Sequence, residues 1–307
     1  HTTVAFGLAA GVVMTLVGML LSPQILLWMA TPQNVMGDSV LYLRLYFAGS
    51  LGFVLYNVSV GILQAVGDSR HPLYYLIISS LINIVLDLVF IGPFHMGVEG
   101  AAIATVISQL VSAVLCLIQL VRTQDCYRLY LSKIRFDGEM LRQIIRLGLP
   151  SGLQNSIIAF ANVVVQSNIN VFGEIAMAGC GAYSKIEGFG FLPITSFTMA
   201  LTTFTGQNLG AGQLERAKKG ARFGIWTTVI LAEIIGVLVF VPQLIAAIDT
   251  NPEVIRFGIE KARTSALFFF LLAYSHSISA LLRGSGKAMI PMAVMLVFWC
   301  VVRVTFL

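Results

Sequence analysis

The chain alternates between long apolar stretches and short polar connections along its whole length. Nine apolar stretches are long enough to cross a bilayer core, which takes about 20 helical residues. Pro150 and Pro193 fall inside two of them and can bend the helices there. The pattern predicts an all-α, polytopic membrane helical bundle. Its nine transmembrane helices are expected at 4–29, 39–65, 72–93, 99–121, 143–171, 178–206, 222–247, 256–282 and 288–307.

Composition agrees with a membrane setting. Of the 307 residues, 57% are hydrophobic and 11% are charged, whereas a soluble domain carries about 25% charged residues because its surface faces water. The formal net charge of +5 would suit a nucleic-acid partner. Most of the charges lie in short loops, however, so we expect the lipid bilayer and no nucleic acid as the partner.

Every second connection between the predicted helices is basic. These connections hold eleven Lys and Arg residues, and the connections on the opposite side hold none. Because basic loops stay on the cytoplasmic side, we predict a multi-pass protein of the plasma (inner) membrane with its basic loops in the cytoplasm. The basic connections are 66–71, 122–142, 207–221 and 283–287.

The longest connection, 122–142, is basic and amphipathic. It is predicted to be a cytoplasmic linker whose helical part lies on the membrane surface. It separates an N-terminal lobe, 1–121, from a C-terminal lobe, 143–307.

The two lobes share an internal repeat at an offset of 219 residues. Duplicated halves are common in transporters, with the substrate site near the interface between them. Completing the repeat predicts two further helices before residue 1 and one after residue 307, twelve in all. The offset places TPQNV (31–35) on TNPEV (250–254), Leu63 on Leu282, Gly67 on Gly286 and Pro72 on Pro291.

Five segments carry a recognisable pattern in a fixed order: SSLINIVLDLVFIGPFHMGVEGAAIATVIS (79–108), RLGLPSGLQNS (146–156), AYSKIEGFGFLP (182–193), GQNLGAGQLERAKKGAR (206–222) and LLRGSGKAMIPM (281–292). Together they resemble the MATE (multidrug and toxic compound extrusion) family of bacterial type. The resemblance covers essentially the whole chain and implies two six-helix lobes related by a pseudo-twofold axis. It also implies a monomeric secondary active antiporter that exports amphipathic cationic drugs in exchange for Na⁺ or H⁺ by alternating access.

Charged residues inside predicted membrane helices are candidate functional residues, because a charge in the bilayer is costly. Asn83 and Asp87 lie one turn apart on one helix face. Their amide and carboxylate oxygens can bind Na⁺, or the carboxylate can take a proton. The resemblance implies that Thr105 and Asn57 belong to the same cation-coupling site.

The second acidic candidate is Glu187, and the resemblance implies that it faces a central cavity that binds a cation or an amine drug. Lys185 precedes it by two residues, a spacing that does not put the two side chains on one face. We expect structural roles for Glu233 and Arg303. The predicted cavity and substrate residues are Glu187, Lys185, Gln154, Asn155 and Tyr183.

No enzyme signature is present in the sequence: it lacks HExxH, GxSxG and Walker A patterns, and its four cysteines lack metal-site spacing. We therefore predict a protein that is not an enzyme and has no cofactor beyond the coupling ion. A lipid-linked oligosaccharide flippase of related two-lobe architecture remains an alternative, although it would need a large cationic cavity. An intramembrane enzyme is the alternative of a different class, and the missing motifs disfavour it.

Overall fold

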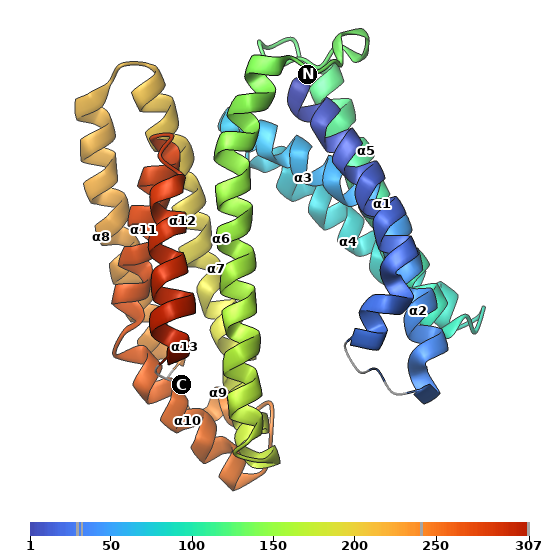
Figure 1. Ribbon diagram of the computed structural model, residues 1–307, viewed down its shortest axis with the longest axis vertical. Helices are drawn as coiled ribbons and strands as arrows, with labels where there is room; N and C mark the ends of the chain where they lie inside the picture. Colours follow the sequence, from blue (N-terminus) through green and yellow to red (C-terminus); the bar gives the residue numbers. More distant parts are fainter. Residues whose placement is uncertain (29–30, 32, 240–241, 306–307) are drawn as a thin grey trace. The chain divides into compact units, whose positions relative to one another are not determined.

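The chain forms two compact units, His1–Gln143 and Ile144–Leu307. The computed structural model describes residues 1–28, 31, 33–239 and 242–305, and none of these lies in a strand (Figure 1). The prediction of an all-α fold is confirmed. The helices of the first unit are α1 (Thr2–Trp28), α2 (Gln33–Ala48), α3 (Ser50–Ala65), α4 (Arg70–Ile91), α5 (Gly97–Arg122) and a 3₁₀ turn, η1 (Leu131–Lys133). Those that follow are α6 (Gly138–Asn170), α7 (Glu174–Gly210), α8 (Leu214–Val239), α9 (Pro242–Ala246), α10 (Pro252–Ala266), α11 (Phe269–Gly284), α12 (Met289–Met295), the π-helical η2 (Leu296–Val302) and α13 (Arg303–Thr305).

Each of the nine predicted spans contains helix in its described residues. By length and composition, α1, α4 and α5 are apolar enough to cross a membrane. The pairs α2–α3 and α10–α11 also qualify, each as one span with a bend of 43° and 54° respectively, which gives up to five spans among the described residues. The number nine stays a prediction. The two bends fall at Gly49 and at Leu267–Phe268, whereas Pro150 and Pro193 lie inside the continuous helices α6 and α7.

The internal repeat is present in the backbone as well as in the sequence. A shift of 219 residues carries the bounds of α2–α3 (33–65) onto those of α10–α11 (252–284) and the start of α4 onto the start of α12. Gly67 and Gly286, which the same shift pairs, both have a positive φ, 90° and 80°. This left-handed conformation favours glycine because a Cβ atom would clash there, so the two halves share one turn geometry.

In the first unit α1 packs on α2 and α3, both of these pack on α5, and α5 packs on α4. Small residues bring the helices close together, as is usual in membrane bundles. Gly7 of α1 lies against Val58, and Gly52 of α3 lies against Leu110 of α5. At the end of the unit that joins the linker, a buried cluster fills the space between helices and linker: Val4, Leu63, Cys116, Leu120 and Leu129.

In the second unit α7 packs on α8, α10 and α11. The Thr202 hydroxyl of α7 donates a hydrogen bond shared between the Thr198 carbonyl of its own helix (2.9 Å) and the Ala280 carbonyl of α11 (3.2 Å). One turn further along α11, Gly284 lies so close to α7 that a Cβ atom would sit 2.5 Å from the Thr202 carbonyl oxygen. The α7–α11 seam therefore has no room for a side chain at position 284.

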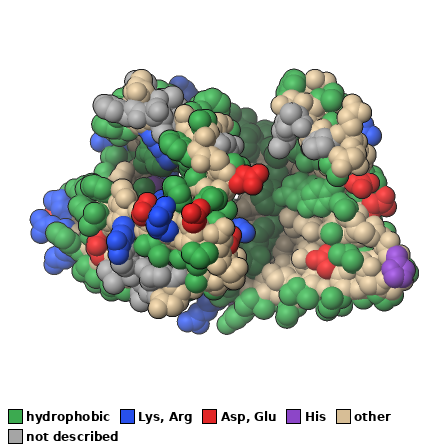
Figure 2. Space-filling model, turned by 90° about the horizontal axis from the view of Figure 1, so that it is seen from below, with side chains coloured by type: hydrophobic (Ala, Val, Ile, Leu, Met, Phe, Trp, Pro, Cys, Tyr) green, Lys and Arg blue, Asp and Glu red, His purple; other side chains and the backbone are tan. Residues whose placement is uncertain are grey.

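Large apolar side chains are exposed on many of the helices, and the end view in Figure 2 shows them among polar and charged groups. Leu20, Phe172 and Phe189 are each more than three quarters exposed, which suits helices surrounded by lipid chains. The linker differs from its prediction: residues 123–137 contain a single 3₁₀ turn, and 138–142 already belong to α6. The linker is held to α1 and α5 instead, because Leu129 N–H donates to the Leu120 carbonyl (2.8 Å) and Thr2 Oγ1 to the Arg135 carbonyl (3.2 Å).

Candidate functional site

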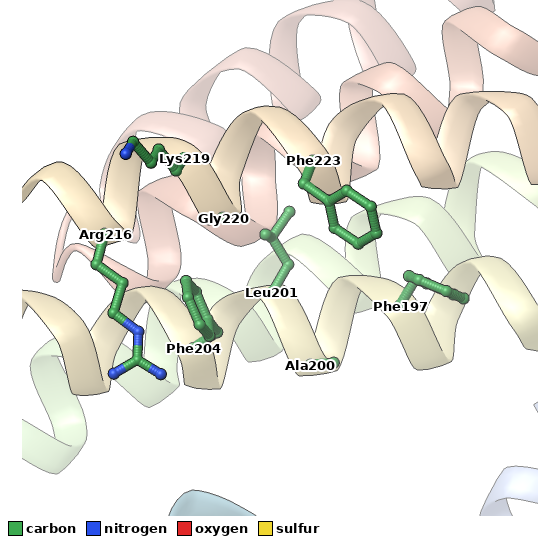
Figure 3. A pocket seen from close by; sticks show the side chains of 9 residues that line it. Phe197, Ala200, Leu201, Phe204, Arg216, Lys219, Gly220 and Phe223 are labelled. Atoms are coloured by element: carbon green, nitrogen blue, oxygen red, sulfur yellow. The ribbon is translucent and has the colours of Figure 1, made fainter.

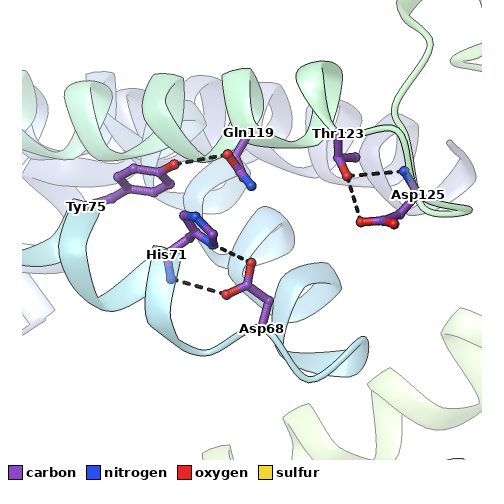
Figure 4. Close-up of polar contacts among 6 residues, drawn as sticks. All are labelled: Asp68, His71, Tyr75, Gln119, Thr123 and Asp125. Carbon is purple, nitrogen blue, oxygen red and sulfur yellow. Dashed lines mark hydrogen bonds and ion pairs between the residues drawn. The ribbon is translucent and has the colours of Figure 1, made fainter.

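One stripe of α4 faces α5. At one end of the stripe Tyr75 Oη donates a hydrogen bond to Gln119 Oε1 of α5 (3.3 Å), as Figure 4 shows. At the other end Phe90 lies against Gly100 of α5. The two helices are therefore antiparallel, and the α4 residues between 75 and 90 at steps of three and four face α5.

Asn83 and Asp87 lie on this stripe, and both residues are partly buried. Two of their polar atoms, Asn83 Nδ2 and Asp87 Oδ1, are fully buried and have no hydrogen-bond partner among the described residues. Buried polar groups in proteins are nearly always paired, and an unpaired buried charge costs several kcal/mol. An acceptor on Asp87 and a donor on Asn83 are thus both left without a partner among the described residues.

The antiparallel register places Asp87 level with Thr105 of α5. The Thr105 hydroxyl donates to the Ala101 carbonyl (2.9 Å), which leaves the hydroxyl oxygen's lone pairs available to accept or to bind a cation. Thr15 of α1 lies at about the same level, because α1 and α5 both contact the break between α2 and α3: Gly18 lies against Phe47, and Gly49 lies against Val106 of α5. The Thr15 hydroxyl is also buried without a partner among the described residues, and sequence reasoning missed it.

Asn57 lies apart from this group. Its side chain is exposed, and its amide donates to the Phe53 carbonyl of its own helix (2.7 Å). Helices α3 and α5 run parallel, with Gly52 against Leu110. This places Asn57 roughly 13 Å from the level of Thr105 along the helix axis, at 1.5 Å per residue. The register thus puts Thr105 level with Asp87, places Asn83 one turn away on the same stripe, and leaves Asn57 outside.

Glu187 lies on α7 at the edge of a cavity of about 490 Å³. The Tyr183 hydroxyl, one turn earlier, donates to Glu187 Oε1 (3.3 Å), and Tyr183 is only 1% exposed. The cavity opens at the break between α10 and α11, where Phe268 and Phe269 lie. An acid and two aromatic rings therefore line one space, and the buried Tyr183 supports the acid from behind.

The cation next to this group is Lys261 of α10 rather than Lys185. Lys261 Nζ lies 5.4 Å from the centre of the Tyr183 ring and 3.5 Å from Ser184 Oγ. Lys185 is exposed on another face of α7, as its spacing from Glu187 predicts. Sequence analysis missed Lys261, although its position inside the predicted span 256–282 was an available signal.

Other residues named from the sequence lie on α6 or contact it. Gln154 of α6 is 3% exposed, and its Oε1 has no partner among the described residues, whereas its neighbour Asn155 is exposed. Arg303 Nη1 donates to Asn162 Oδ1 of α6 (3.1 Å), and its guanidinium lies 4.4 Å from the centre of the Trp299 ring.

Glu233 of α8 has a structural partner at the break in α10–α11. Its Oε1 accepts a hydrogen bond from the Phe270 backbone N–H (3.1 Å). Phe270 is the second residue of α11, so its N–H has no partner within the helix. The carboxylate therefore caps this helix from outside, where the helix dipole also favours a negative charge.

Comparison with known proteins shows which family the chain belongs to. The MatE family profile matches residues 1–89 and 150–307. Two probable multidrug resistance proteins of Bacillus subtilis, YoeA and YpnP, are 29% and 27% identical to the chain over 94% of its length, and the chain spans 65% of the length of each. A solved MOP superfamily transporter from Pyrococcus furiosus, described as having a binding pocket of reverse polarity, superposes with a TM-score of 0.91. That structure is 25% identical to the chain, and the match covers 99% of this chain and 69% of the other. A match over most of its residues, with the same helical architecture, means that the chain belongs to the MatE family of membrane transport proteins.

Proposed function

We propose that this chain works in a secondary active multidrug exporter, in which a cation that enters drives an amphipathic cationic drug out by alternating access. The observation that carries the proposal is Asp87 Oδ1, a buried carboxylate oxygen without a partner among the described residues. In this proposal the protein acts as a monomer in the plasma membrane, with its basic connections on the cytoplasmic side.

The coupling step takes place at Asp87 in this proposal. Sodium prefers oxygen ligands, and the Asp87 carboxylate, the Asn83 amide oxygen and the Thr105 hydroxyl offer three from two helices. A proton on Asp87 would neutralise the same charge. Either event removes the cost of an unpaired buried carboxylate, several kcal/mol, which is enough to shift a helical bundle between two conformations. Among the described residues no cluster of three His, Cys, Asp or Glu side chains suits a heavier metal.

The drug site in this proposal is the cavity at Glu187. A positively charged amine would pair with the Glu187 carboxylate, and its apolar part would lie on Phe268 and Phe269 at the helix break. Lys261 already acts electrostatically on the Glu187 carboxylate, although its ammonium group lies at the Tyr183 ring and at Ser184.

Ethidium efflux from vesicles containing the full chain tests both sites. Efflux is measured separately under a Na⁺ gradient and under a pH gradient, and the gradient that drives it identifies the coupling ion. We expect Asp87→Asn to abolish efflux under either gradient while ethidium still binds, and Glu187→Gln to weaken ethidium binding by about 10-fold, the effect of losing one charged contact. Asp68→Asn is the matched control, because Asp68 bonds His71 outside the predicted spans (Figure 4). Undiminished efflux by Asp87→Asn would remove Asp87 from the mechanism.

A further inference from the structure

An apolar groove runs along the seam between α7 and α8 (Figure 3). Its volume is about 540 Å³, within the range of about 300–1,000 Å³ that holds small organic ligands. Phe197 and Phe204 of α7 and Phe223 of α8 form its walls, with Ala200 between them. The groove is open on the outside, since Phe223 is 71% exposed.

Two glycines of α8 account for the groove. Gly220 packs on the ring of Phe204, and Gly224 packs on Leu201 so closely that a Cβ atom would lie 2.6 Å from the leucine side chain. Without side chains at 220 and 224, α8 lies directly on α7. The large residues on either side then project outward and leave a channel between them.

One end of the groove is positively charged. Arg216 and Lys219 line it at the first turns of α8, and the Arg216 guanidinium lies 5.9 Å from the centre of the Phe204 ring. Neither cation forms an ion pair with a described residue, whereas Lys218, between them in sequence, is paired with Glu215 at 2.9 Å. The positive charge at the groove end is thus not neutralised locally.

We propose that this groove binds an anionic phospholipid, with the phosphate on Arg216 and Lys219 and one acyl chain along Phe197, Phe204 and Phe223. A long apolar channel that ends in two unpaired cations is complementary to a molecule with a phosphate at one end and a hydrocarbon chain at the other. An amphipathic cation, the substrate class of the proposed transport, would be repelled from the same end. The lipid site is therefore separate from the drug site and independent of the transport proposal.

Trp226, one turn along α8 from Phe223 and 66% exposed, can report occupancy. The test uses the full chain with Trp28 and Trp299 changed to Phe, in phosphatidylcholine vesicles that contain increasing fractions of brominated phosphatidylglycerol. Bromine quenches tryptophan fluorescence only at close range, so quenching of Trp226 measures binding beside it. We expect brominated phosphatidylglycerol to be preferred over brominated phosphatidylcholine by roughly 30-fold, from about fivefold for each of the two cations.

Three variants separate charge, shape and position. Arg216→Gln with Lys219→Gln should lower the preference to near one, and Ala200→Phe should fill the groove and reduce quenching by either lipid. Lys218→Gln is the matched control, and its preference should equal that of the unchanged chain. Equal binding of the two lipids by the unchanged chain would overturn the proposal, as would an equal loss in Lys218→Gln or unaltered quenching in Ala200→Phe.

Two further outcomes identify a different occupant and also overturn the proposal. Complete competition by millimolar glycerol phosphate would mean that the cations bind a free phosphate without an acyl chain. Absence of quenching by any lipid, together with a dimer that Ala200→Phe dissociates, would mean that a second copy of the chain covers the groove.

Discussion

The hydrogen bond between Glu233 and the Phe270 N–H makes a quantitative prediction about the break between α10 and α11. A hydrogen bond to a charged group contributes about 1.5–3 kcal/mol, and one between neutral groups about 0.5–1.5 kcal/mol. Gln keeps an acceptor oxygen but loses the charge, whereas Met loses both at similar size. We therefore expect the free energy of unfolding to fall by about 1 kcal/mol in Glu233→Gln and by about 2 kcal/mol in Glu233→Met.

Thermal unfolding of the purified chain in detergent measures both changes. For a unit of this size each kcal/mol corresponds to roughly 2–4 °C in Tm, so the two variants should be separable. Glu260→Gln is the control, because Glu260 is an exposed acid on α10 near the same break. The reasoning is refuted if Glu233→Met matches Glu260→Gln, or if the Gln variant is as unstable as the Met variant.

Three other substitutions, one of them with a control, can be measured in the same assay. Gly284→Ala should lower stability by about 1–3 kcal/mol, because its Cβ would meet the Thr202 carbonyl of α7. Gly181→Ala is the control: an added Cβ there would have no atom within 4 Å, so the variant should be neutral or slightly stabilised. Equal effects of the two substitutions would contradict the close approach of α7 and α11. Gly286→Ala should cost about 1–2 kcal/mol, because an alanine is strained at φ 80°. Thr202→Val removes the hydrogen bond to Ala280 and should cost about 0.6 kcal/mol, the average for such bonds between membrane helices; a stabilised variant would count against that bond.

Much of the fold follows from the sequence, because the hydrophobic pattern fixes where helices form. The positions of the two breaks do not follow. Residues 267–269, Leu-Phe-Phe, are as apolar as their neighbours, and what permits the break there is the carboxylate of Glu233 on another helix. A tertiary partner of this kind leaves no local signal.

The candidate sites show the same limit. A spacing of four residues was enough to place Asn83 and Asp87 on one face, because both lie on one helix. The partner of Tyr183 was not predictable, since Lys261 reaches it only through the packing of α10 on α7. Closeness in sequence does not imply contact either: Lys185 lies two residues from Glu187, but its side chain is exposed on another face of α7.

The repeated backbone shows how two halves of the same architecture can come to differ in chemistry. If both halves descend from one gene, selection has kept the helix lengths and the turns at Gly67 and Gly286 while the side chains diverged. The two bends differ in chemistry. The break between α2 and α3 lies at Gly49, whereas after the break between α10 and α11 the Glu233 carboxylate of α8 accepts a hydrogen bond from the Phe270 N–H. A single carboxylate at one of them makes two bends of a repeated backbone chemically distinct.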